Sequence, residues 1–121
     1  MRVRHVKRIP LYDATAPIVC TIDADEIPVR RELLDRIRVS VLAVERTPDG
    51  FVLQLSPDRE VDARAFVNDE KRCCGFWGFD VTPGAGTVAL RWDGPPDVAP
   101  LVERLASYFR GEADLDSTGL F

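Results

Sequence analysis

The sequence predicts an α+β fold in which helices pack on one face of an antiparallel sheet. Two regions read as β-hairpins, because alternating apolar residues flank the turns Pro48-Asp49-Gly50 and Pro83-Gly84-Ala85-Gly86. A helical pattern follows each hairpin, and another precedes the first one. The expected order is therefore α-ββ-α-ββ-α, which also suggests a loose duplication of a ββα unit without a clear sequence repeat.

The composition is that of one globular domain. The chain has 121 residues, 45% hydrophobic and 30% charged, with a formal net charge of -4. We divide it into an irregular basic arm (1–17), a single α+β domain (18–111) and an acidic tail (112–121). The excess of acids does not favour binding to nucleic acid, and no apolar run approaches the ~18 residues of a membrane span. Three cysteines without a secretory signal predict a cytoplasmic protein with free thiols.

The first helix and hairpin follow from proline and apolar spacing. Residues 18–22 alternate and are rich in β-branched side chains, which predicts a short strand. Pro28 suits the first turn of a helix whose apolar face lies within residues 33–37, although the start of this helix stays open. The strands of the first hairpin are expected at residues 39–46 and 51–55.

Proline also marks the start of the two later helices. Ser56-Pro57 should supply an N-cap and a first-turn proline for a helix that runs to about Cys74, with Gly75 after it. Asp97 and Pro100 should do the same for the last helix. The strands between these helices are expected at residues 77–82 and 88–92, with three aromatic side chains in the sheet core: Trp77, Phe79 and Trp92.

The helix before the second hairpin has an unusual face. Residues at helical spacing form one stripe that should face the sheet: Ala63, Phe66, Val67, Glu70, Cys73 and Cys74. A buried carboxylate such as Glu70 needs a partner or a raised pKa. That partner would be an arginine from the sheet, a metal ion or a proton; the alternative is a helix-edge position from which Glu70 reaches solvent.

The three thiols are the only chemically distinctive set in the sequence. Cys20, Cys73 and Cys74 are soft ligands suited to ions such as zinc, copper(I), mercury or arsenic(III), and Glu70 would be a further ligand or an acceptor beside them. Adjacent residues on a helix point about 100° apart, so Cys73 and Cys74 can share an ion only where the helix loosens. Gly75 allows such loosening, but the distance from Cys20 to the pair cannot be read from the sequence.

Two other interpretations of the cysteines stay open. They can be core residues of a structural module that forms a homodimer through its sheet or arm, since free cysteine is among the most buried residue types. They can also be a redox set in which Cys20 pairs reversibly with Cys73 or Cys74, provided that the two Cα atoms lie within about 7 Å. Enzymatic activity is not expected: a helix C-terminus opposes a thiolate, and the only histidine is His5 in the arm.

The segment from Glu70 to Phe79 contains the pattern Glu-x-x-Cys-Cys-x-Phe-x-x-Phe. It resembles a motif of small uncharacterised bacterial proteins, and it is similar to segments that follow the DNA-binding part of some MerR-type regulators. Gly75 departs from this family, which often has proline or a small residue after the second cysteine. The resemblance implies soft-metal or thiol sensing by Cys20, Glu70, Cys73 and Cys74. Because this chain has no helix-turn-helix of its own, a regulatory role would need a separate regulator protein.

The function expected from the sequence is therefore a thiol-based binding or sensing module for a soft metal or metalloid ion. Its expected ligands are Cys20, Glu70, Cys73 and Cys74.

Overall fold

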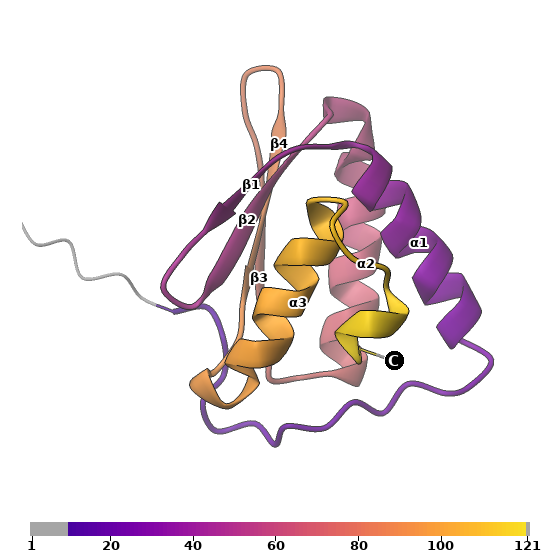
Figure 1. Cartoon of the computed structure of the whole chain (residues 1–121), viewed down its shortest axis with the longest axis vertical. Helices are drawn as coiled ribbons and strands as arrows, with labels where there is room; N and C mark the ends of the chain where they lie inside the picture. The colour runs from indigo at the N-terminus through magenta and orange to yellow at the C-terminus, as the bar shows by residue number, and fades with distance from the viewer. Residues whose placement is uncertain (1–9, 121) are drawn as a thin grey trace, which may run out of the picture.

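The computed structural model describes residues 10–120, in which three α-helices pack against a four-stranded antiparallel sheet (Figure 1). The helices are α1 (Ile27–Val39), α2 (Glu60–Cys73) and α3 (Ala99–Phe109), and the strands are β1 (Val41–Arg46), β2 (Gly50–Leu55), β3 (Gly78–Pro83) and β4 (Val88–Asp93). The short 3-10 turns are η1 (Pro57–Arg59) before α2, η2 (Pro96–Val98) before α3 and η3 (Asp116–Thr118) after α3. The α+β class and the α-ββ-α-ββ-α order are confirmed.

The two hairpins join side by side to form the sheet, whose strand order is β1-β2-β4-β3. In the register, Trp92 of β4 lies opposite Phe51 of β2 on one side and opposite Phe79 of β3 on the other. These three rings therefore share one face of the sheet, because side chains alternate between faces along a strand.

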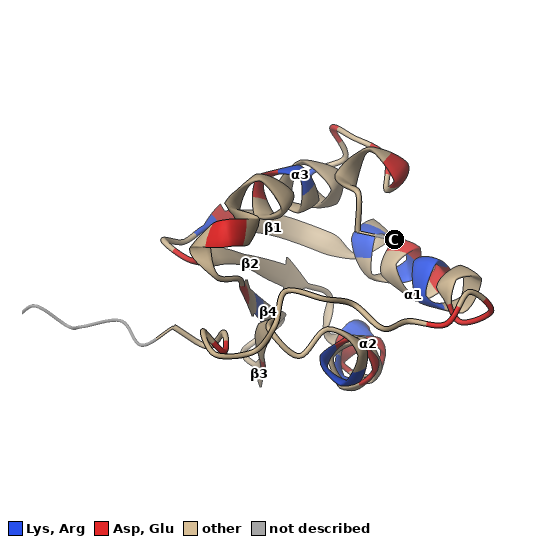
Figure 2. Ribbon diagram, turned by 90° about the horizontal axis from the view of Figure 1, so that it is seen from below, with Lys and Arg blue, Asp and Glu red and all other residues tan. Residues whose placement is uncertain are grey.

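Helices α2 and α3 cover that aromatic face. The ring of Phe66 in α2 packs 5.3 Å from the ring of Trp92, and the ring of Phe109 in α3 lies 6.0 Å from it. Helix α1 packs against α2, and the end-on view shows the helices on the same side of the sheet (Figure 2). Lysine, arginine, aspartate and glutamate are intermixed along α1 and α2 in this view, so neither helix presents a charge of one sign.

Proline sets the helix starts, but the predicted caps are wrong. Helix α1 begins at Ile27 with Pro28 in its first turn, which settles the start that the sequence left open. Pro57 instead opens the turn η1, so α2 begins only at Glu60, and the hydroxyl of Ser56 donates to Asp58 rather than capping the helix. The residue at the N-cap of α3 is Val98, so Asp97 does not cap it either.

The strand predicted at residues 18–22 is wrong. These residues have no regular secondary structure and cross the C-terminal end of α2. The backbone N–H and the hydroxyl of Thr21 both donate to the carbonyl of Cys73, at 3.0 and 3.2 Å. The last carbonyls of a helix lack partners within it, so the segment bonds to a helix end instead of to a sheet edge.

Residues 10–16 also lie against the domain, whereas residues 1–9 of the predicted basic arm lie outside the described residues. The backbone N–H of Leu11 donates to the buried carboxylate of Asp93 at 3.1 Å, and the N–H of Asp13 donates to the carbonyl of Phe76. A Cβ at position 78 would come within 2.0 Å of the carbonyl carbon of Leu11, so only glycine fits beneath this crossing.

The C-terminal residues up to 120 follow α3 and pack against it. Leu115, Thr118 and Leu120 are buried, and the guanidinium of Arg104 donates to the carbonyl of Thr118. None of the helices within residues 10–120 has the length and apolar character that crossing a membrane requires.

Candidate thiol site

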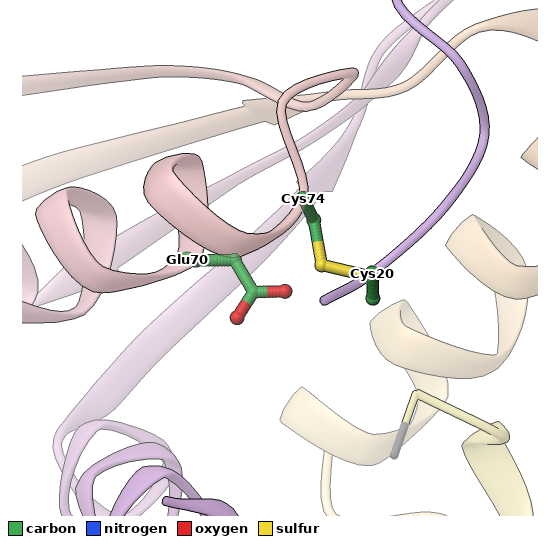
Figure 3. A group of neighbouring side chains, drawn as sticks. All are labelled: Cys20, Glu70 and Cys74. Atoms are coloured by element: carbon green, nitrogen blue, oxygen red, sulfur yellow. A yellow bond between two sulfur atoms is a disulfide. The ribbon is translucent and has the colours of Figure 1, made fainter. Parts of the chain in front are cut away.

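The cysteine motif lies where α2 ends and the segment 18–22 crosses it. Cys20 and Cys74, which are 54 residues apart in sequence, form a disulfide with their Cα atoms 4.4 Å apart (Figure 3). The expectation of free thiols is therefore wrong for this pair, and it holds for Cys73. The physical reason is the bonding of Thr21 to the helix end, which fixes Cys20 beside Cys74.

The two cysteines at the helix end diverge because the backbone leaves the helix between them. Cys73 is the last residue of α2, and Cys74 is its cap, with the non-helical angles φ -126° and ψ 78°. The N–H of Cys74 still donates to the carbonyl of Glu70 at 2.7 Å. The helix thus loosens at Cys74, one residue before Gly75, and the side chain of Cys74 turns toward Cys20.

Glu70 projects from the last turn of α2 on the side of the disulfide (Figure 3) and is fully buried. One of its carboxylate oxygens accepts a hydrogen bond from Nη1 of Arg30 at 2.6 Å. The other oxygen, Oε1, has no hydrogen-bond partner of normal geometry among the described residues, and neither does the indole N–H of Trp77. Burial raises the pKa of Glu70 above its usual value, although Arg30 and the Trp77 indole oppose the rise.

Cys73 belongs to a different set of neighbours. Its buried Sγ lies 3.6 Å from Nη2 of Arg30 and 4.0 Å from a carboxylate oxygen of Glu26. Arg30, itself only 3% exposed, therefore joins Glu70, Cys73 and Glu26. Burial lowers the pKa of Arg30, but the hydrogen bond with Cys73 and the charge of Glu70 more than offset this, so that its pKa is raised.

Three of the four predicted ligands come together. One Sγ each from Cys20 and Cys74 and a carboxylate oxygen of Glu70 all lie within 4.8 Å of one another. Cys73 is not part of this group. The donor set of two sulfurs and one carboxylate suits a soft or borderline metal ion, but a sulfur held in a disulfide does not act as a thiolate ligand, so only the reduced pair could hold one.

The sequence pointed to an arginine from the sheet as one partner for Glu70, whereas Arg30 comes from α1. A signal for it was present. Arg30 falls three, four and seven residues before three buried apolar residues of α1: Leu33, Leu34 and Ile37. It is therefore a charged residue on an apolar stripe, as Glu70 is on α2, and two such anomalies of opposite charge predict a buried pair.

Comparisons with protein-family models, with curated proteins and with solved structures found no match to the chain.

Proposed function

We propose that Cys20, Cys74 and Glu70 form a redox-gated binding site for a soft metal or metalloid ion. In the dithiol form the three side chains bind the ion, and in the disulfide form the site is closed. The observation that carries this proposal is the mutual distance of the three donor atoms, all within 4.8 Å.

The closed site becomes able to bind an ion when thiol–disulfide exchange reduces the Cys20–Cys74 bond. An external dithiol gives two electrons and two protons to the Cys20–Cys74 bond and is itself oxidised to a disulfide. Both cysteines then lose their protons when they bind the ion, because thiolates are the ligands. Zinc–sulfur bonds of about 2.3 Å and zinc–oxygen bonds of about 2.0–2.2 Å need only small movements of donors that already lie this close.

The charge of the site supports the same conclusion. Two thiolates and the Glu70 carboxylate would place three negative charges close together, two of them on buried residues, where Arg30 supplies one positive charge. A multivalent cation would compensate the rest, and the Glu70 carboxylate offers it an oxygen. Cys20 comes from a segment without regular structure that Thr21 bonds to the end of α2, and Glu70 and Cys74 come from the end of α2 itself.

Native mass spectrometry of the reduced protein tests the proposal, with one equivalent each of Zn(II), Hg(II) and As(III) as probes. We expect a one-to-one adduct with at least one probe, and its loss in Cys20→Ser and in Cys74→Ser. Glu70→Gln should weaken it by roughly tenfold or more. Cys73→Ser is the matched control, since it makes the same change one residue away and should keep the adduct.

Two results would contradict this assignment. An adduct that survives Cys74→Ser but not Cys73→Ser would move the site to the Arg30 side of the helix. The absence of any adduct in a reduced protein that keeps its far-ultraviolet circular dichroism would leave the Cys20–Cys74 bond as a structural cross-link of an interaction module.

A further inference from the structure

The residues just before the exposed end of the disulfide are apolar and open to solvent. Ile18 is 44% exposed and Val19 is 53% exposed, and Cys20 follows them directly. The composition of residues 18–22 favours a β-strand, yet no strand pairs with them in the part of the chain that the structure describes. Within that same part, the N–H and C=O of Cys20 form no hydrogen bond to another backbone group, although the N–H groups of Val19 and Thr21 beside it do. The segment thus has strand-forming side chains and, at Cys20, a backbone without a backbone partner beside a disulfide.

The two residues of the disulfide differ in exposure. Cys20 is an exposed residue, whereas Cys74 is completely buried. In thiol–disulfide exchange a thiolate attacks one sulfur and the other leaves, so access decides which sulfur is attacked. Attack is therefore expected on Sγ of Cys20, with Cys74 as the leaving group.

We propose that residues 18–22 are the docking segment for a protein dithiol, which pairs with them as an added strand and attacks Sγ of Cys20. This inference rests on the reversible disulfide of the proposed function. The partner's thiolate forms a bond with Cys20, the Cys20–Cys74 bond breaks, and its electron pair leaves on the sulfur of Cys74, which takes up a proton. The partner's second thiol then attacks the mixed disulfide and releases Cys20, so the partner leaves oxidised and both cysteines are reduced.

The surroundings of Cys20 favour a polypeptide over a small thiol as the partner. A small thiol needs access to the sulfur alone and gains nothing from neighbouring residues. A polypeptide can bond to the N–H and C=O of Cys20, as in other cases of strand addition. It can also cover Ile18 and Val19 and so remove their exposed apolar surface from water.

The test compares the second-order rate constants for reduction of the folded protein by a thioredoxin-type protein dithiol and by dithiothreitol. Val19→Asp should lower the rate constant with the protein dithiol about tenfold, because tenfold corresponds to about 1.4 kcal/mol of docking free energy. It should leave the rate constant with dithiothreitol unchanged. Val61→Asp is the matched control: Val61 is 78% exposed on α2, and its substitution should change neither rate.

Trapping gives an independent readout. A protein dithiol that lacks its second cysteine should stop at a mixed disulfide, and peptide mass mapping should find that bond on Cys20. A bond to Cys74, or a Val19→Asp variant that reacts as fast as the wild type with the protein dithiol, would overturn the docking proposal. A disulfide that resists both reductants in the folded protein would instead contradict the redox gate of the proposed function.

Discussion

Helices α2 and α3 are built alike at their starts and differently at their ends. Each follows a 3-10 turn that proline opens, and each places a phenylalanine against the ring of Trp92. The last turn of α3 completes the core with Tyr108 and Phe109. The last turn of α2 instead buries Glu70 and Cys73.

The difference shows where this fold departs from maximal stability. A buried ion pair seldom stabilises more than well-packed apolar side chains would, because both charges lose their hydration. The end of α3 buries aromatic side chains, whereas the end of α2 buries a charged residue. We interpret the polar end of α2 as the part of the fold where reactive side chains take the place of apolar packing.

The largest expected effect comes from removing the phenylalanine ring that each helix packs against Trp92. Phe66→Ala and Phe109→Ala should each lower the free energy of unfolding by about 3–5 kcal/mol, since both side chains are buried against Trp92. Urea unfolding measures both, and Val61→Ala on the exposed side of α2 should stay within about 0.5 kcal/mol. If the two losses in free energy of unfolding differ by more than twofold, the two helices do not contribute equally to the core.

The next test makes the end of α2 apolar. Glu70→Leu should destabilise by about 3–5 kcal/mol, because it leaves the guanidinium of Arg30 buried without its carboxylate. The double substitution Arg30→Met with Glu70→Leu should recover most of that loss. Glu26→Gln, at the 40% exposed partner of the same arginine, should change stability by less than about 1 kcal/mol. A double variant no more stable than Glu70→Leu would mean that the pair is needed for packing.

The disulfide distinguishes the two helices further, since only α2 is tied to another segment by one. Without reductant, Cys20→Ser should lower the free energy of unfolding by about 2–4 kcal/mol, because the bond closes a loop across 54 residues. With a reductant present, the wild type and the variant should unfold at nearly the same urea concentration. A variant as stable as the wild type without reductant would contradict the structural contribution of the bond.

The smallest effect concerns the end of α3. The hydroxyl of Tyr108 donates to Asp35 of α1, and Tyr108→Phe should cost about 1 kcal/mol near neutral pH. Burial and the bond to Asp35 raise the pKa of Tyr108 above its usual value of 10.0. The folded protein keeps this proton where the unfolded chain has lost it, so stability should fall as the pH rises above about 10. Unfolding between pH 9 and 11 should show a steeper fall in the wild type than in Tyr108→Phe.

The regular elements were predictable because they depend on local periodicity and on proline and glycine. The buried pair of Arg30 and Glu70 was also encoded in the sequence, because each of these charged residues falls on the apolar stripe of its helix. The contact between Cys20 and Cys74 could not be predicted from the sequence. It depends on backbone hydrogen bonds between Thr21 and the end of α2, and such bonds produce no pattern in the sequence. The strand predicted at residues 18–22 failed for a related reason, since composition does not say whether a sheet edge lies nearby.

The attachments of residues 10–22 have a consequence for the order in which the chain is made. Leu11 bonds to a residue 82 positions later, and Cys20 to one 54 positions later. During synthesis on a ribosome these residues emerge before α2 and β4, so nothing is yet present for them to bind. Cys20 has no cysteine to pair with until Cys73 and Cys74 have been added. The Cys20–Cys74 bond in a growing chain would therefore show that the whole of α2 has been made.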